Sequence, residues 1–241
     1  MTLTTRRSRP LFLVIQAAVL CLASPALAGD ALRGYGSFHA LMGLHSWGGA
    51  TVDAYEGNAK LDGLSDASFN VSSTGGFYLS GYSVVYPEMV HVGGFFEYQA
   101  GELQLFTDRV QTAAQPRGVQ LDVDRTVHDL ALGISAKLSG RMTNRFWSGA
   151  ALDLGPSFLF GGGERMATGF RLFPRLTFDY LPWTLRERFQ LGVSVSIGVE
   201  IEVHASGELE YDDPLTAGLA RSDFDYSFVR PVLLVGGTFG L

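Results

Sequence analysis

The stretch FQLGVSVSIGVEIEVH, residues 189–204, decides the fold class of this chain. Its even positions hold glutamine, glycine, serine, glutamate and histidine. Its odd positions are all apolar and mostly β-branched: Phe189, Leu191, Val193, Val195, Ile197, Val199, Ile201 and Val203. A period of two with β-branched residues on one face indicates a β-strand and not a helix. The run is longer than the roughly 5–6 residues of an ordinary strand and covers the about 9–11 residues that a transmembrane strand needs.

Seven other segments repeat this alternation less regularly. In the segment 170–181, apolar residues alternate with Arg171, Arg175, Thr177 and Asp179. The remaining segments are 34–45, 77–86, 90–99, 130–138, 146–160 and 226–241. Since lipid offers no partner for an open strand edge, such strands must close into a barrel. The sequence therefore predicts an all-β, antiparallel, up-and-down transmembrane β-barrel of eight strands.

The connections between these segments alternate in length. Long connections fall near 46–74, 100–125 and 205–225, and short ones near 87–88, 141–144 and 182–188. This alternation is typical of barrels with short periplasmic turns and long extracellular loops, and it predicts an even strand count. A ten-stranded barrel that uses part of 46–74 as an extra hairpin stays open.

Three prolines lie inside predicted strands: Pro156, Pro174 and Pro231. Proline cannot donate to a ladder, and a closed barrel has no edge on which to place it. We therefore expect bulges or strand ends at these positions. The alternative fold is a secreted soluble β-barrel or sandwich, which would be recovered in a soluble fraction without detergent.

The first 28 residues have the pattern of a secretory signal peptide. Three arginines precede the apolar run 11–22, and Ala26-Leu27-Ala28 forms a cleavage site before Gly29. We therefore expect a cleaved leader, 1–28, and one barrel domain, 29–241. The only cysteine, Cys21, belongs to the leader, so the mature chain has no disulfide and no cysteine-based site.

The composition of the mature chain excludes some functions. The leader carries three arginines and no acids, so a net charge of −6 for the whole chain becomes −9 after cleavage. An acidic, exported protein is a poor candidate for binding nucleic acid. The mature chain also has no apolar run of 18 residues, and so no expected transmembrane helix.

The chain resembles the small outer-membrane β-barrels of OmpA-like or OmpX-like size. The resemblance rests on the eight-strand pattern and on the C-terminal stretch VLLVGGTFGL, residues 232–241. That family usually ends on an aromatic residue, whereas this chain ends on Leu241 with Phe239 two positions earlier. The resemblance implies a monomer in the cell outer membrane of a Gram-negative bacterium, with no cofactor. Its implied partners are outer-membrane lipids, lipopolysaccharide and the barrel-assembly machinery.

The inward face of the predicted barrel carries charges of both signs. By alternation it holds Glu97, Asp129, Lys137, Asp153, Arg171, Arg175, Asp179, Glu200, Glu202 and Arg230. Eight strands leave an interior that side chains can fill, so these charges are expected to pair and plug the lumen. The alternative is a narrow path for ions or small solutes lined by the same charges.

A second candidate site is His204-Ala205-Ser206, followed by Glu208, at the end of the best strand. Residues two apart on a strand point to one side, so the histidine could activate the serine and Glu208 could orient the histidine. The pair is similar to the H-x-S motif of outer-membrane lipid A deacylases, although Gly207 stands where that family usually has asparagine. The alternative is a strand-end histidine beside a polar loop, which makes the chain a non-enzyme.

The acids of the loop 206–225 could bind Ca²⁺ or Mg²⁺, but their spacing is not that of an EF-hand, so we expect no metal site. They are Glu208, Glu210, Asp212, Asp213, Asp223 and Asp225. The function expected from the sequence is a structural or surface-interaction role. The alternatives are a small pore or conduit for ions or hydrophobic solutes and, more remotely, a lipid A-modifying esterase.

Overall fold

The computed structural model describes residues 34–56, 59–60, 66–86, 89–107, 122–161, 164–186, 189–209 and 219–240. The predicted leader, 1–28, and the last residue lie outside these ranges. The described part consists of β-strands, and none of it is a helix long and apolar enough to span a bilayer.

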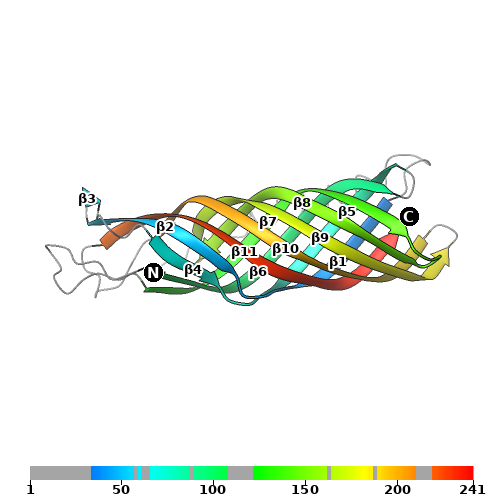
Figure 1. Ribbon diagram of the computed structural model, residues 1–241, viewed down its shortest axis with the longest axis horizontal. Coiled ribbons are helices and arrows are strands. Elements are labelled where there is room, and N and C mark those ends of the chain that lie inside the picture. The colour runs from blue at the N-terminus through cyan, green and yellow to red at the C-terminus, as the bar shows by residue number, and fades with distance from the viewer. Residues whose placement is uncertain are drawn as a thin grey trace, which may run out of the picture.

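Eight strands close into one antiparallel barrel, which confirms the predicted fold class (Figure 1). Each strand pairs with its neighbours in the chain, and β1 pairs with β11 from Tyr35 opposite Gly240 to Gly43 opposite Val232, which closes the circuit. The eight strands are β1 (Gly34–Gly43), β5 (Thr74–Tyr86), β6 (Val90–Thr107), β7 (Asp122–Arg141), β8 (Phe146–Gly161), β9 (Glu164–Arg186), β10 (Phe189–Leu209) and β11 (Leu219–Gly240).

Three further strands decide between an eight-stranded and a ten-stranded barrel. They are β2 (Trp47–Glu56), β3 (Ala59–Lys60) and β4 (Asp66–Val71). β2 pairs with β11 and β4, and β4 pairs with β6, so β2 and β4 continue the paths of β1 and β5 around the barrel. The segment 46–74 does contain a hairpin, but it lengthens two existing strands. The ten-stranded alternative is therefore wrong.

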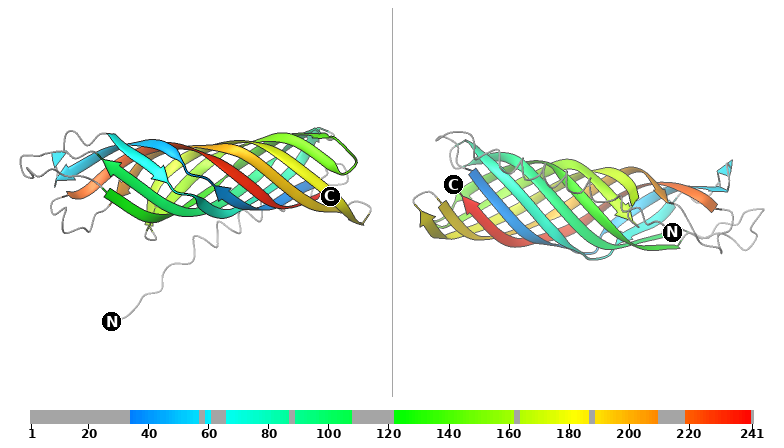
Figure 2. Two further views of the ribbon diagram at one scale, coloured as in Figure 1. Left: turned by 60° about the horizontal axis from the view of Figure 1, so that its bottom comes forward. Right: turned by 180° about the vertical axis from the view of Figure 1, so that it is seen from behind.

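Most of the strands are longer than the alternation predicted, whereas β1 and β8 keep nearly the predicted bounds. β9 has 23 residues and β11 has 22, against the about 9–11 that cross the hydrocarbon layer. β6 and β7 likewise extend into the segment expected to be the loop 100–125. We name the end with the β5–β6, β7–β8 and β9–β10 connections the turn end, and the opposite end, which carries β2, β3 and β4, the loop end. The barrel is strongly elongated (Figures 1 and 2), and most of the additional length lies at the loop end, although β7 and β9 also extend at the turn end.

The prolines follow the expectation in one case of three. At Pro231 the β1 side has an extra residue, because residues 44–46 lie opposite 230–231, and Leu44 N donates to Pro231 O at 3.0 Å. Pro156 and Pro174 instead pair in register with Phe170 and Leu152. On the other side of each strand, the ladder leaves out the proline and the residue before it without a register shift. The expected bulge is wrong there, because a missing donor can be accommodated by leaving those positions unpaired.

The outward face of β10 is apolar, as the alternation of 189–204 predicted. Val193, Ile197 and Val203 are about half exposed, whereas Ser194, Ser196 and Glu200 are buried. A charge added to the outward face of a membrane barrel destabilises it by about 2–4 kcal/mol near the middle of the bilayer.

We therefore expect Ile197→Arg to lower the free energy of unfolding by about 2–4 kcal/mol in lipid vesicles. Urea unfolding followed by tryptophan fluorescence measures this loss. Asp124→Arg is the control, because Asp124 is exposed at the loop end of β7 and its replacement should change the stability by less than about 1 kcal/mol. An unchanged stability of Ile197→Arg would show that this face meets water.

Candidate functional site

The middle of the barrel interior contains three layers of side chains. Alternate residues of one strand share a face, and on β9 the inward positions are, in succession, Arg171, Phe173, Arg175, Thr177 and Asp179. A charged layer near the loop end is thus followed by an apolar layer and then by a second charged layer near the turn end. β6 and β11 follow the same order, with Glu97 before Phe95 and Arg230 before Val232 and Leu234.

The turn-side charge cluster consists of Lys137, Asp153, Arg175 and Asp179. Lys137 Nζ lies 2.5 Å from Asp179 Oδ2 and 3.2 Å from the Tyr35 hydroxyl. Arg175 Nε donates to Asp153 Oδ2 at 3.0 Å. All four charged side chains are less than a tenth exposed. Two cations face two carboxylates, so this layer is electrically balanced.

Two tyrosines from β5 complete the turn-side charge cluster. Arg175 Nη2 donates to the hydroxyls of Tyr78 at 2.6 Å and Tyr82 at 2.8 Å. Tyr78 in turn donates to Asp153 Oδ2 at 2.9 Å, and Ser135 donates to Asp153 Oδ1. Arg175 thereby connects β5 with β8 across the interior through hydrogen bonds.

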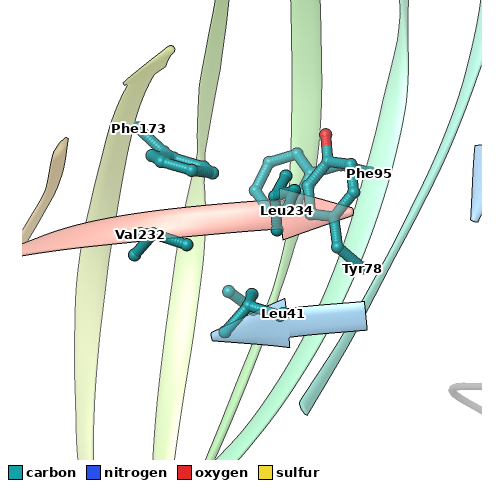
Figure 3. Close-up of a cluster of buried hydrophobic side chains, with 7 residues drawn as sticks. Leu41, Tyr78, Phe95, Phe173, Val232 and Leu234 are labelled. Carbon is teal, nitrogen blue, oxygen red and sulfur yellow. The ribbon is translucent and has the colours of Figure 1, made fainter. Parts of the chain in front are cut away.

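The apolar cluster, drawn in Figure 3, lies between the two charged layers, as Phe173 lies between Arg171 and Arg175 on β9. Its members are Leu41, Tyr78, Phe95, Ala131, Phe173, Val232 and Leu234, all at most 5% exposed. The labelled side chains converge from β1, β5, β6, β9 and β11, and the rings of Tyr78 and Phe95 stack with centroids 6.1 Å apart. An apolar layer excludes water and therefore interrupts any continuous polar path along the axis.

The loop-side charge cluster consists of Arg171, Arg230, Glu97, Asp129, Glu200 and Glu202. Arg171 Nη1 lies 2.6 Å from Glu97 Oε1, and its Nη2 lies 2.8 Å from Glu200 Oε1 and 3.2 Å from Glu202 Oε1. Arg171 Nη2 also donates to Asp129 Oδ2. A single buried guanidinium therefore contacts four carboxylates from β6, β7 and β10.

The second arginine of this cluster has one main partner. Arg230 Nε and Nη2 each donate to the Glu200 carboxylate at 2.9 Å, the bidentate geometry of a strong ion pair. Gln99 Nε2 donates to Glu200 Oε2 at 3.1 Å and also to Glu97, and Thr74 donates to Gln99 Oε1 at 2.7 Å. Both oxygens of Glu200 therefore have donors.

Three carboxylates of the loop-side charge cluster come close enough to surround an ion. Asp129, Glu200 and Glu202 each place one oxygen within 4.8 Å of the others, a spacing compatible with a metal ion. Arg171 Nη2 contacts all three, so the guanidinium already takes the place that a metal would occupy.

The structure places all ten predicted lumen residues inside the barrel, each at most 6% exposed. It divides them into two clusters, a grouping that the sequence did not predict. Sequence reasoning also missed the apolar cluster and the polar partners Thr74, Tyr78 and Tyr82. The sequence did contain a signal for Phe173, because this residue is two positions from both Arg171 and Arg175 and so lies on the same face of the strand.

The second predicted site is described only in its backbone. His204, Ser206 and Glu208 belong to β10, and their side chains lie outside the described residues. The ladder with β11 shifts register between His204 and Gly207. The prediction that His204 and Ser206 lie on the same side depended on strict alternation, and the register shift interrupts the alternation there. The deacylase-like arrangement stays a prediction.

The acidic loop is described in part. Glu210, Asp212 and Asp213 lie outside the described residues. Asp223 is paired with Glu208 on one side and with Asp53 of β2 on the other, and Asp225 is exposed. The backbone thus places Glu208, Asp223 and Asp53 in one row of the sheet, and their side chains lie outside the described residues.

Comparison with known proteins supports the fold. No protein-family model matches the chain, and no curated sequence matches it. Among solved structures, the outer membrane protein OprG from Pseudomonas aeruginosa is 14% identical with a TM-score of 0.53, and the match covers 88% of this chain and 97% of that one. The outer membrane protease OmpT from Escherichia coli is 10% identical with a TM-score of 0.41, and the match covers 89% and 99%.

The class of protein follows from the closed circuit of strands and from the likeness to OprG. The chain has the fold of the small, eight-stranded outer-membrane β-barrels, as the sequence predicted.

Proposed function

We propose that this protein is a non-conducting barrel of the cell outer membrane, with a structural or surface-interaction role. The observation that carries the proposal is the filled interior, in which an apolar cluster lies between two networks of paired charges. A lumen closed in this way offers ions no wet path, because each of the ten described lumen charges contacts a group of opposite charge and the apolar cluster excludes water between the two charged layers.

The loop end is the part of the molecule that would meet partners. The strands exceed the thickness of the hydrocarbon layer, so β2, β4 and the outer parts of β6, β7, β10 and β11 project beyond it. We expect this projection to contact lipopolysaccharide and other surface molecules, with the short connections in the periplasm and the barrel acting as a monomeric anchor.

Cysteine labelling tests the location, the orientation and the closed interior together. The only cysteine lies in the predicted leader, so each single variant of the mature chain would carry one thiol. With a bulky maleimide that does not cross the outer membrane, Asp124→Cys should be labelled on intact cells. Asn144→Cys, in the exposed β7–β8 turn, should be labelled only after the envelope is broken.

The interior is probed by Ser196→Cys with a small water-soluble thiol reagent. Ser196 is 0% exposed, so its thiol should react only after denaturation. Reaction in the folded barrel would indicate an open lumen and contradict the proposal. Labelling of Asn144→Cys on intact cells, or none of Asp124→Cys, would contradict the proposed orientation.

A further inference from the structure

One buried histidine makes no hydrogen bond to either charge cluster. His39 of β1 points into the lumen and is 1% exposed, and the centroid of its ring lies 5.9 Å from that of Tyr78 in the apolar cluster. Neither His39 Nδ1 nor Nε2 has a hydrogen-bond partner in the described part of the chain. Buried polar groups are almost always hydrogen-bonded, so an imidazole with two unpartnered nitrogens indicates a role beyond packing.

The small neutral groups beside His39 make their contacts elsewhere. Ser37 and Ser80, the inward residues next along β1 and β5, share a hydrogen bond at 2.7 Å. The β11 residue paired with His39 is Gly236, and even a Cβ atom there would lie 2.5 Å from His39 Cα. The described neighbours on these strands therefore leave the imidazole without an acceptor.

The charged groups that face His39 come from β7 and β9. They are Lys137, Arg175 and Asp179, and Asp179 already forms an ion pair with Lys137 at 2.5 Å. Tyr78, the titratable neighbour on β5, donates its hydroxyl proton to the turn-side charge cluster. A proton on His39 would therefore find no counter-charge of its own among these groups.

Such a proton would disturb the balance of the turn-side charge cluster. That layer holds two cations and two carboxylates, and an imidazolium would be a third cation. In an imidazolium both ring nitrogens donate, and a buried ion without acceptors loses its hydration without compensation. The proton can therefore be held only if water reaches the ring, and water there would part the side chains at the edge of the apolar cluster.

We infer that His39 is an acid-sensitive switch in the lumen. At neutral pH its ring is uncharged and sealed, and in acid its protonation admits water to the turn-side half of the barrel. The inference rests on the closed interior of the proposed function. Since that proposal places the turn end in the periplasm, the switch would respond to acid there.

The pH dependence of unfolding tests whether the folded barrel keeps His39 uncharged. In an unfolded chain, histidine binds a proton below about pH 6.5, so unfolding in mild acid would take up one proton at this residue. Stability is thus lost as the pH falls, and His39 should raise the unfolding equilibrium constant about 10-fold per pH unit between about pH 6 and 5. His39→Phe should remove this factor. Urea unfolding of the full chain in lipid vesicles measures both slopes.

Two further variants make the comparison diagnostic. His128→Phe should keep the wild-type slope, because His128 is exposed and its ring bonds the Tyr98 hydroxyl at 2.8 Å. His39→Leu should behave like His39→Phe, so that the result does not depend on how one ring packs. His91 stays in every variant and contributes equally to all slopes.

The opening is measured with the Ser196→Cys thiol and a pyridyl disulfide, a reagent that reacts with thiols in acid. The rate is expressed relative to that of the unfolded chain at the same pH. It should rise about 10-fold per pH unit between about pH 6 and 5, as the protonated form becomes more populated. With His39→Phe in the same chain, the rate should not rise.

Three results would overturn the inference: equal slopes in the wild type and His39→Phe, a thiol that stays unreactive at pH 5, or acid-induced reaction that is the same with and without His39. A thiol that already reacts at neutral pH would instead contradict the closed interior, and the switch with it. The failure of the switch alone is therefore distinguishable from the failure of the proposed function.

Discussion

Replacing Arg171 by alanine is expected to lower the free energy of unfolding by about 3–5 kcal/mol, the range found when one partner of a buried ion pair is removed. The side chain is 0% exposed and contacts Glu97, Asp129, Glu200 and Glu202. Without it, the four buried carboxylates lose the cation that contacts each of them in the described part of the chain. Urea unfolding of the refolded barrel in vesicles measures the loss.

Arg141→Ala is the matched control for Arg171→Ala. Arg141 is an exposed arginine at the turn end, where it donates to Asn144 at 3.1 Å and lies over the Trp147 ring. Exposed pairs of this kind contribute about 0–1 kcal/mol. If both variants lost equally little stability, Arg171 would not be the centre of a buried network.

Replacing Phe173 by alanine is the second substitution with a large expected effect, again about 3–5 kcal/mol. Phe173 is 0% exposed in the apolar cluster, between Arg171 and Arg175 on the same face of β9. The cavity left by the ring would join the two charged layers. We therefore expect water to enter the lumen, so that Phe173→Ala combined with Ser196→Cys reacts with a small thiol reagent in the folded state.

Phe170→Ala controls for the loss of a phenylalanine from the same strand. Phe170 faces outward and is 53% exposed, so its removal should cost about 1 kcal/mol and leave the Ser196→Cys thiol unreactive. Equal losses in the two variants would argue that Phe173 does not close the interior.

Much of the fold could be predicted because alternation is a local property of the sequence. The parity of 189–204 assigned the outward valines and the inward glutamates of β10 correctly, and the same parity placed Arg171, Arg175 and Asp179 inside. Strand ends were harder to predict. At the loop end, β2 and β4 lie in a segment where glycine and serine weaken the alternation, so it resembled a loop.

The grouping of the lumen charges could not be predicted from one sequence. Arg171 contacts residues of β6, β7 and β10, and their height along the axis depends on the stagger between strands. A shift of two residues on one strand keeps every side chain on its face but changes all of its partners. The division of the lumen charges into two layers therefore becomes visible only once the register is known.

The most direct test of the closed interior is single-channel recording of the refolded wild type in a planar lipid bilayer at neutral pH. We predict a membrane that stays at its baseline conductance after the protein has inserted, with insertion verified by the heat-dependent gel mobility of the folded barrel. Steady, reproducible open steps from the wild type would contradict this account and show that the lumen is a pore.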